Sequence, residues 1–326
     1  MENPITMNKK TSDSAPELLV LRALMPEQMQ QLEQRFVLHR HDLAQDAGAL
    51  IASVGPRIRG VVTNGGSGFQ AAMLPQLPAL EIVASSGVGT DSIDISACRQ
   101  RGVHVTNTPD VLNDDVADLG IGLIMNAMRR LAAAHEYTRR GDWARKGMMP
   151  LTTSLRGKRL GIVGLGRIGR ELANRAIALK MEVSYHGRRR QDVPYVFHDR
   201  LADLAANVDI LVLLCPGGPE TRHLVDQAVL DALGPNGWLV NLSRGSVVDE
   251  AALLDALESG GIAGAALDVY ENEPHIDTRF LGLDNVILSP HHASATTQTR
   301  SAMAQLVVDN LLAHFQGRPL LTPVGQ

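Results

Sequence analysis

Aromatic residues, cysteines and an excess of positive charge are all missing or scarce in this chain of 326 residues. Aromatic side chains make up 3% of the sequence, and the formal net charge at pH 7 is −4. A nucleic-acid-binding protein would need clustered cations for the phosphates and, for single strands, aromatic rings for base stacking, so that class is disfavoured. The two cysteines, Cys98 and Cys215, cannot build a disulfide-rich scaffold or a four-thiolate zinc site, and no metal site is expected.

The chain also lacks a long hydrophobic run. No apolar stretch reaches the roughly 18–20 residues that a membrane helix needs, and the polar N-terminal segment MENPITMNKKTSDSAPE has no signal-peptide character. Hydrophobic residues nevertheless form 44% of the sequence, which suits globular domains, and the length is enough for about two of them. We expect a cytoplasmic protein of two domains, preceded by a flexible arm over residues 1–16.

Short apolar runs alternate with longer amphipathic stretches along the chain. This alternation predicts parallel strands joined by helices, because parallel neighbours need a crossover connection. The first series has expected strands at 17–24, 36–39, 59–63, 80–85 and 103–107, and expected helices at 27–35 and 93–101. The second series has expected strands at 160–164, 181–186, 209–215, 238–242, 263–269 and 286–288. The fold class is therefore α/β, with two doubly wound parallel sheets.

Two longer helices are expected outside these series. Acidic residues open and basic residues close the segment 113–140, which suits the dipole of one long helix with a buried apolar middle. The stretch 296–315 has helical periodicity and is expected to return to the first domain.

The most informative motif is Gly164-Leu-Gly166-Arg-Ile-Gly169, which follows an expected strand and precedes an expected helix at 170–180. Gly164 would allow the tight turn, Gly166 would let the backbone approach a pyrophosphate, and Gly169 would permit close packing of helix on strand. The N–H groups at the helix start would bind the phosphates. This context favours dinucleotide binding over glycines that only punctuate a loop.

The end of the next expected strand indicates which dinucleotide binds. An NAD enzyme usually has Asp or Glu about 20 residues after the first glycine, to bind the ribose 2′-hydroxyl. Here that stretch reads Ser184-Tyr-His-Gly187-Arg188-Arg189-Arg190, without a carboxylate. Guanidinium groups match the oxygens and charge of a 2′-phosphate, so we expect NADP(H) to be preferred to NAD(H). A solvated basic loop is the alternative.

Three polar residues follow three successive expected strands of the second series. Arg244 lies in NLSRGSVVD, Glu273 in ALDVYENEP and His291 in VILSPHH. Ligands bind at the carboxyl ends of strands in open α/β sheets, so these side chains should meet beside a bound nicotinamide. Each residue alone could be an ordinary surface or turn residue. Their joint placement after a dinucleotide loop points to catalysis.

These motifs resemble those of the D-isomer-specific 2-hydroxyacid dehydrogenase family. The resemblance covers nearly all of the chain after the arm and is carried by SSGVGTDSID, VTNTPDVLNDDVADLGIGLI, GIVGLGRIGR, NLSRGSVVDE, ALDVYENEP and SPHHASAT. Within the family, VTNTPDVLNDDVADL, CPGGPETRH and ALGPNG look most like NADPH-dependent hydroxyphenylpyruvate and glyoxylate/hydroxypyruvate reductases. The resemblance implies a Rossmann-type NADP-binding domain over 109–294, inserted into a flavodoxin-like substrate domain of residues 1–108 and 295–326. It also implies a homodimer joined mainly through the cofactor domains.

The resemblance assigns roles to individual residues as well. Arg244 would bind the carboxylate of a 2-oxo acid, His291 would give a proton to its carbonyl oxygen, and Glu273 would orient His291 and stabilise its cationic form. The backbone amides of Val88 and Gly89 would form a cradle for the substrate carboxylate. The positions expected to contact the cofactor are Leu165, Gly166, Arg167, Ile168, Gly187, Arg188, Arg189, Cys215, Pro216, Leu242 and Asp268.

Two positions depart from common family patterns. Many members have His-Ile-Gly where this chain has His291-His292-Ala293, and we assign the acid to His291 because it directly follows Pro290. His292 is then a packing residue or one that supports the catalytic residues without touching the substrate. Glu273 stands where formate dehydrogenases have Gln, which argues against formate as the substrate.

The sequence therefore predicts an NADPH-preferring reductase that converts glyoxylate, hydroxypyruvate or an arylpyruvate to the D-2-hydroxy acid. An NAD-linked catabolic dehydrogenase of a D-2-hydroxy acid is the alternative among enzymes. A dinucleotide-sensing binding protein, similar to the family's transcriptional corepressors, is the alternative from another class. Selectivity for the substrate side chain is expected in the loops near 64–69 and 88–90.

Overall fold

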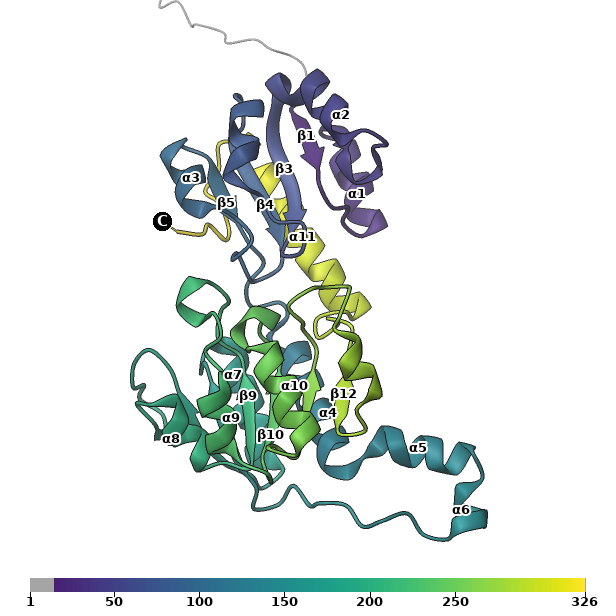
Figure 1. Ribbon diagram of the computed structural model, residues 1–326. Helices are drawn as coiled ribbons and strands as arrows, with labels where there is room; N and C mark the ends of the chain where they lie inside the picture. The colour runs from purple at the N-terminus through teal and green to yellow at the C-terminus, as the bar shows by residue number, and fades with distance from the viewer. Residues whose placement is uncertain (1–14, 326) are drawn as a thin grey trace, which may run out of the picture. The chain divides into compact units, whose positions relative to one another are not determined.

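The computed structural model describes residues 15–325, so nearly all of the arm expected over residues 1–16 lies outside the described residues. The described chain forms two compact units. The first runs to Thr108 and resumes at Ser301, and the second is Pro109–Arg300. Each unit is a sheet covered by helices on both faces (Figure 1). No helix within the described residues has the length and apolar character needed to cross a membrane.

The first unit contains a five-stranded parallel sheet. Its strands are β1 (Glu17–Val20), β2 (Val37–Arg40), β3 (Ile58–Asn64), β4 (Ile82–Ser86) and β5 (His104–Thr106). Their order across the sheet is β2-β1-β3-β4-β5, and every pairing is parallel. This is the strand order of flavodoxin-like folds. The flavodoxin-like topology predicted for this part of the chain is confirmed.

The strands of the first unit send alternate side chains to two separate cores. Leu19 and Val61 lie in one buried cluster, whereas Leu18 and Val62 lie in the other. This follows from the two-residue period of a strand. The helices of this unit are α1 (Pro26–Glu33), α2 (Ala47–Val54), α3 (Ile95–Gln100) and the greater part of α11 (Thr297–Phe315). Leu311 of α11 packs in the same cluster as Leu18.

The second unit contains a seven-stranded parallel sheet. Its strands are β6 (Arg159–Val163), β7 (Glu182–His186), β8 (Val196–Phe197), β9 (Ile210–Leu213), β10 (Trp238–Asn241), β11 (Gly264–Leu267) and β12 (Val286–Leu288). The order is β12-β11-β10-β9-β6-β7-β8. The direction of winding reverses between β6 and β9, and dinucleotides bind at such a switch point. The predicted α/β fold with two doubly wound parallel sheets is confirmed.

Helices cover both faces of this second sheet (Figure 1). They are α4 (Asn113–Arg129), α7 (Arg167–Ala178), α8 (Leu201–Ala206), α9 (Gln227–Leu233) and α10 (Glu250–Ser259), and two further helices of the unit, α5 (Leu131–Arg139) and α6 (Asp142–Lys146), lie outside these layers (Figure 1). The 3₁₀ turns of the two units are η1 (His41–Leu43), η2 (Gly55–Arg57), η3 (Ala71–Gln76), η4 (Pro219–Thr221), η5 (Gly245–Val247) and η6 (Thr278–Gly282). The second unit ends at Arg300, inside α11, whereas the expected cofactor domain ended at residue 294.

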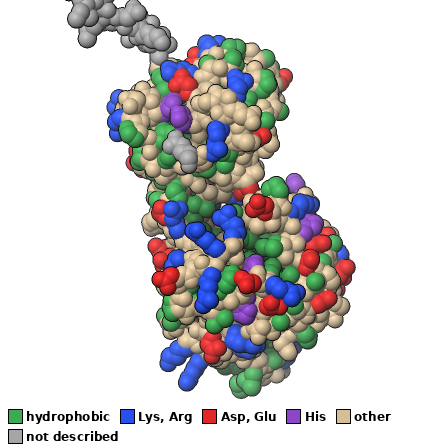
Figure 2. All heavy atoms as spheres, turned by 90° about the vertical axis from the view of Figure 1, so that its left-hand side faces the viewer, with side chains coloured by type: hydrophobic (Ala, Val, Ile, Leu, Met, Phe, Trp, Pro, Cys, Tyr) green, Lys and Arg blue, Asp and Glu red, His purple; other side chains and the backbone are tan. Residues whose placement is uncertain are grey.

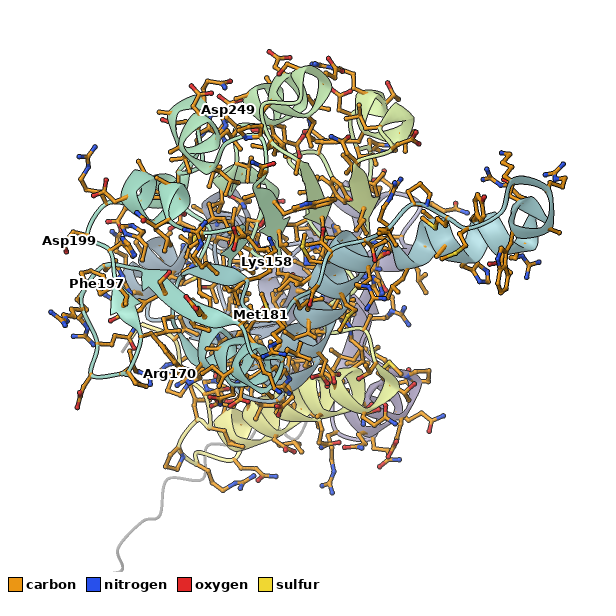
Figure 3. The ribbon with its side chains drawn as sticks, turned by 90° about the horizontal axis from the view of Figure 1, so that it is seen from below. Lys158, Arg170, Met181, Phe197, Asp199 and Asp249 are labelled. Atoms are coloured by element: carbon orange, nitrogen blue, oxygen red, sulfur yellow. The ribbon has the colours of Figure 1, made fainter. Side chains whose placement is uncertain are left out.

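The prediction of a single helix over 113–140 is wrong. Arg130 has left-handed backbone angles (φ 48°, ψ 45°) and separates α4 from α5. α4 buries one apolar side, including Leu123 and Ile124, whereas α5 buries none of its residues. The break therefore falls where the core contacts of the segment end. Figures 1 and 3 show that α5 and α6 extend away from the rest of the second unit.

Candidate active site

The second unit gathers the predicted cofactor and catalytic positions just beyond the carboxyl ends of its strands. Leu165–Ile168 follow β6, Gly187–Arg189 follow β7, Cys215 and Pro216 follow β9, Leu242 and Arg244 follow β10, Asp268 and Glu273 follow β11, and His291 follows β12. Because all the strands are parallel, these loops line one edge of the sheet. This is the edge where open α/β sheets bind their ligands.

The glycine loop at the end of β6 has the geometry of a phosphate-binding turn. Gly164 has a positive φ of 96°, and an added Cβ would lie 2.7 Å from the amide nitrogen of Cys215. At Gly169 an added Cβ would lie 2.6 Å from the carbonyl oxygen of Gly164, so the helix packs closely on the turn. At Gly166 an added Cβ would meet no protein atom within 4 Å. The loop therefore leaves open space at the position expected to approach a pyrophosphate.

Helix α7 begins within this loop, at Arg167 rather than at residue 170. Its first N–H groups therefore lie beside the glycines, where the positive end of the helix dipole favours a bound anion. The side chain of Arg167 forms an exposed ion pair with Asp110, 3.0 Å apart.

The stretch from Ser184 on β7 to Arg190 in the following loop carries no carboxylate. Arg188, Arg189 and Arg190 are exposed, and within residues 15–325 none of the three forms a hydrogen bond or an ion pair. An added Cβ at Gly187 would meet no protein atom within 4 Å. Figure 2 shows Lys and Arg side chains gathered on one face of the second unit. Guanidinium groups without internal partners can bind an external anion such as a phosphate.

His291 and Glu273 form a close pair at the ends of β12 and β11. The Nδ1 atom of His291 lies 2.6 Å from Oε2 of Glu273, and the amide of Tyr270 donates to Oε1 at 3.0 Å. Burial would raise the pKa of Glu273. The hydrogen bonds from His291 and Tyr270 and the positive charges of His291 and Arg244 outweigh burial and hold this pKa below its usual value. Glu273 is therefore an anion beside the imidazole.

The loop that carries His291 is held by a buried carboxylate. Asp268 is 1% exposed and accepts hydrogen bonds from the amides of His292 and Ala293, each at 3.0 Å, and from the hydroxyl of Ser289. These three contacts involve residues on both sides of His291 in the sequence. The backbone of His291 itself has a positive φ of 50°. A left-handed conformation is unfavourable for a residue with a side chain, so the anchored neighbours maintain it. We expected Asp268 to contact the cofactor, and its observed contacts are with this loop.

Tyr270 joins the loops that carry Glu273 and His291. Its hydroxyl lies 3.0 Å from the carbonyl oxygens of Leu267 and Ser289 and accepts from the amide of Ser289 at 3.1 Å. Burial raises the pKa of Tyr270 to about 12, so the hydroxyl keeps its proton. A protonated hydroxyl can donate to one carbonyl while it accepts from the amide. The Glu273 turn and the His291 loop are thereby fixed to each other.

Arg244 comes from the neighbouring strand end and reaches the same group of residues. It is partly buried, and its Nη1 atom donates to the carbonyl of Ser243 at 2.8 Å. An added Cβ at the next residue, Gly245, would lie 1.9 Å from the carbonyl carbon of Tyr270. The backbones of the Arg244 loop and the Glu273 turn are therefore in direct contact, and only glycine fits between them.

The predicted substrate cradle lies in the first unit. Val88 and Gly89 follow β4, and Val88 is 37% exposed. The side-chain amide of Asn107 donates to the carbonyl of Val88 at 2.9 Å, and the amide of Gly87 donates to the hydroxyl of Thr108 at 2.9 Å. These contacts order the turn within its own unit. A contact of Val88 and Gly89 with substrate stays a prediction.

The sequence analysis did not identify several residues that organise the site. Gly245, Tyr270 and Ser289 join the catalytic loops, and Gln191 contacts the glycine loop. The adjacency of Gly245 to Arg244 was the available signal for the first. Nothing in the sequence indicated the other three, because their partners are distant in the chain. His292 is exposed, and its Nδ1 atom lies 2.9 Å from the hydroxyl of Ser289.

Cys215 follows β9 at the switch point, and its thiol is not activated. Burial raises its pKa, and its Sγ atom lies 3.9 Å from the hydroxyl of Ser243. A thiol that keeps its proton is a poor nucleophile. Its neighbour Leu242 is buried beside Gly120 of α4, where an added Cβ would meet the Leu242 side chain at 2.9 Å.

A glycine loop at the switch point of a parallel sheet, with an imidazole–carboxylate pair and a guanidinium on the same edge, defines an oxidoreductase that uses a nicotinamide dinucleotide. The comparisons identify the family. The model of the D-isomer specific 2-hydroxyacid dehydrogenase NAD binding domain matches residues 121–293. The chain belongs to this family, whose members interconvert 2-oxo acids and 2-hydroxy acids. The family resemblance predicted from the sequence motifs is confirmed.

Named relatives cover almost the whole chain. A glyoxylate/hydroxypyruvate reductase A of Arabidopsis thaliana is 49% identical over 295 residues, which are 90% of this chain and 94% of the relative. A hydroxyphenylpyruvate reductase of Plectranthus scutellarioides is 48% identical over 296 residues, with the same coverage. A solved NADPH-dependent glyoxylate/hydroxypyruvate reductase of Sinorhizobium meliloti, in complex with NADP and malonate, has a TM-score of 0.88 and 42% identity, and the match covers 96% of this chain and 97% of that one.

Proposed function

We propose that this protein reduces a small 2-oxo acid, such as glyoxylate, hydroxypyruvate or an arylpyruvate, to the D-2-hydroxy acid, with NADPH as the preferred reductant. The observation that carries the proposal is the 2.6 Å contact between His291 and Glu273 on the edge that also holds Arg244 and the glycine loop. The activities for which the relatives are named support the substrate class.

Each of the three side chains can perform a different part of the reduction of a 2-oxo acid. When bound, NADPH supplies the hydride that reduces carbon 2. Glu273 engages Nδ1 of His291, so Nε2 is the nitrogen that can give a proton to the carbonyl oxygen. Arg244 binds the substrate carboxylate through its planar guanidinium and places positive charge near the oxygen that becomes negative. The products are the 2-hydroxy acid, the oxidised dinucleotide and a neutral His291, which regains its proton from solvent.

The preference for NADPH is assigned to Arg188 and Arg189. Both are exposed and without internal partners among residues 15–325, and no carboxylate lies between Ser184 and Arg190 to accept from a ribose 2′-hydroxyl. Hydrogen bonds to a charged group contribute about 1.5–3 kcal/mol, so each arginine should favour NADPH by roughly tenfold to a hundredfold. The solved relative in complex with NADP supports this assignment.

The test of the cofactor preference is kcat/KM with NADPH and with NADH on one 2-oxo acid. Arg188→Ala and Arg189→Ala should raise KM for NADPH about tenfold or more and leave KM for NADH within about twofold. Arg200→Ala, an exposed arginine elsewhere in the same unit, is the matched control. A wild-type preference for NADH would instead favour the NAD-linked catabolic dehydrogenase. Less than one turnover per site would favour a dinucleotide-sensing protein.

We assign recognition of the substrate carboxylate to Arg244 together with the amides of Val88 and Gly89, and side-chain selectivity to the loops near 64–69 and 88–90. A methylene or ring contact in such a loop is worth about 1–3 kcal/mol. A panel of glyoxylate, hydroxypyruvate, phenylpyruvate and hydroxyphenylpyruvate, ranked by kcat/KM with NADPH, identifies the preferred side chain. A panel in which no 2-oxo acid is reduced would contradict the proposed function.

We also propose that the protein is a homodimer and that the α5–α6 segment contacts the second copy. Leu131 and Trp143 in this segment are 49% and 63% exposed, and α5 buries no residue. Large exposed apolar side chains concentrated in one projecting segment are typical of an interface. Trp143→Glu should convert the dimer to monomer in sedimentation experiments. Leu281→Glu, which alters a 67% exposed leucine on η6, is the control, and a monomeric wild-type protein would refute the proposal.

A further inference from the structure

Gln191 lies directly after the arginine loop, Gly187–Arg190, and hydrogen-bonds to three separate elements. Its backbone amide donates to the hydroxyl of Tyr185 on β7 at 2.7 Å. Its side-chain Nε2 donates to the carbonyl oxygen of Leu165 in the glycine loop at 2.8 Å. Its Oε1 atom accepts from the guanidinium of Arg170 on α7. A single residue therefore ties the arginine loop to the glycine loop and to the helix that follows it.

The support for Gln191 is rigid. Tyr185 is fully buried, and its ring packs against Phe197 of β8 with ring centroids 5.2 Å apart. Figure 3 shows Phe197 and Arg170 on the same side of the second unit. The Tyr185 hydroxyl also lies 3.4 Å from the carbonyl oxygen of Gln191, so the backbone of Gln191 is held at both its amide and its carbonyl.

No other side chain makes this connection among the residues that the structure describes. The ends of β6 and β7 are joined by the backbone bond from the amide of Gly164 to the carbonyl of His186, at 2.9 Å. The ring of His186 bonds the carbonyl of His198, on the side of β8. Beyond these strand ends, Gln191 is the only residue within 15–325 that hydrogen-bonds from the β7 loop to the glycine loop.

The distance between these two loops has a chemical meaning. The glycine loop is the site expected for the pyrophosphate, and Arg188 and Arg189 are expected to bind the 2′-phosphate. Both phosphates belong to one covalent molecule, so their separation is limited by the ligand. Hydrogen bonds weaken steeply when their distance or angle departs from the optimum. The guanidinium groups can therefore bind the 2′-phosphate well only if the protein holds the two loops at a separation that matches the ligand.

We propose that Gln191 is a positioning residue that sets the separation between the glycine loop and the arginine loop, and that it thereby contributes to selectivity for a 2′-phosphorylated dinucleotide. The inference deepens the proposed NADPH preference and depends on it. This role requires no contact between Gln191 and the 2′-phosphate. It acts through Leu165 on one side and through the arginine loop on the other.

The test measures binding of NADP⁺ and NAD⁺ to the full-length protein by isothermal titration calorimetry, which does not depend on turnover. Gln191→Leu removes both side-chain hydrogen bonds at similar volume. We expect Kd for NADP⁺ to rise about tenfold and Kd for NAD⁺ to rise less than about twofold. Gln191→Glu keeps an acceptor for Arg170 but cannot donate to the carbonyl of Leu165, so it should shift the same ratio in the same direction.

Gln227→Leu is the matched control. The Nε2 atom of Gln227, on α9, donates to Asp231 at 2.7 Å, so this variant also removes a glutamine hydrogen bond from an exposed position of the same unit. It should leave the ratio of the two Kd values unchanged. If Gln191→Leu raises both Kd values equally, Gln191 has only a structural role and the inference is overturned.

A double-variant cycle separates the inference from the proposed function. If Gln191 acts through the arginines, Gln191→Leu should change Kd for NADP⁺ by less than about twofold in a protein that already carries Arg188→Ala and Arg189→Ala. A fully additive loss would overturn the inference. If the two arginine substitutions leave Kd for NADP⁺ unchanged, the proposed NADPH preference fails and the inference fails with it. If they raise it and Gln191→Leu does not, the inference alone fails.

Discussion

Nδ1 of His291 lies 2.6 Å from Oε2 of Glu273, although the two side chains come from loops after different strands. The loops are held in register by Tyr270, Ser289 and Asp268, none of which needs to touch the substrate. The arrangement commits one imidazole nitrogen to an anion and leaves the other for proton transfer. The geometry of the pair therefore predicts which of the two adjacent histidines is the acid.

His291→Gln should lower kcat for reduction of a 2-oxo acid by about 10²–10⁴-fold, because a positioned proton donor contributes about that factor. KM for NADPH should change little. The adjacent His292 contacts Ser289 and not Glu273, so His292→Gln should reduce kcat by less than about tenfold. Steady-state kinetics on both folded variants tests this. Near wild-type turnover by His291→Gln, or an equal loss in the two variants, would contradict the assignment.

Arg244→Lys keeps the positive charge and loses the planar two-pronged donor. We expect kcat/KM for the 2-oxo acid to fall about 10–100-fold, since a hydrogen bond between charged groups contributes about 1.5–3 kcal/mol. Most of the loss should appear in KM if the guanidinium mainly binds the carboxylate. Arg279→Lys, which alters an exposed ion pair with Glu258, is the control and should change kcat/KM less than about twofold. Equal effects at both positions would argue against a role for Arg244.

Asp268→Asn replaces an acceptor-only group by one that must place N–H donors against the amides of His292 and Ala293. The loss should be about 1–3 kcal/mol in the free energy of unfolding. Since the loop carries His291, kcat should fall while KM for NADPH stays within about threefold. Urea unfolding and steady-state kinetics measure the two effects. A large rise in KM for NADPH with unchanged kcat would favour the contact with the cofactor that the sequence suggested.

Gly245→Ala would place a Cβ 1.9 Å from the carbonyl carbon of Tyr270, where backbone faces backbone. The two loops must separate, so we expect a loss of about 1–3 kcal/mol or more in the free energy of unfolding and a large fall in kcat. Gly122→Ala on the exposed side of α4 meets no atom within 4 Å and should be neutral or stabilising by up to about 1 kcal/mol. Activity of Gly245→Ala equal to wild type would show that the contact is not required.

The lowered pKa of Glu273 predicts a pH-dependent contribution to stability. A carboxyl group whose pKa is lower in the folded than in the unfolded protein stabilises the fold above its unfolded pKa, and loses that contribution as the pH falls through its folded pKa. The difference in free energy of unfolding between wild type and Glu273→Gln should therefore be constant near pH 7 and shrink as the pH falls below about 4.3. Urea unfolding at several pH values tests this, with Glu220→Gln on the exposed turn η4 for the background. A difference that grows on acidification would contradict it.

The sequence predicted those parts of the molecule that depend on local pattern. Continuous apolar runs identified the buried strands, and the glycine spacing identified the turn at the end of β6, because backbone geometry there admits few other residues. His291, Glu273 and Arg244 could be placed on one edge since parallel strands share their direction. Strand β8 was missed because Val196–Phe197 is too short to show a period.

Other features depend on contacts between distant residues, which no local pattern records. The break at Arg130 follows from where α4 stops packing, although the segment favours helix on both sides. Strand β1 ends at Val20 rather than at residue 24, because the next two amides both turn to the carbonyl of Val62. Gln191 is one polar residue among many, and only the fold brings it to Leu165, 26 positions away.

The contacts that join the His291 loop to the Glu273 turn lie within Pro109–Arg300. The turns at Gly245, Tyr270 and Asp268 contact one another directly. A substitution in one of these turns should therefore disturb the others. The loops expected to select the substrate side chain belong to the other unit. Substitutions in those loops can therefore alter substrate specificity during evolution while His291, Glu273 and the turns that hold them keep their sequence.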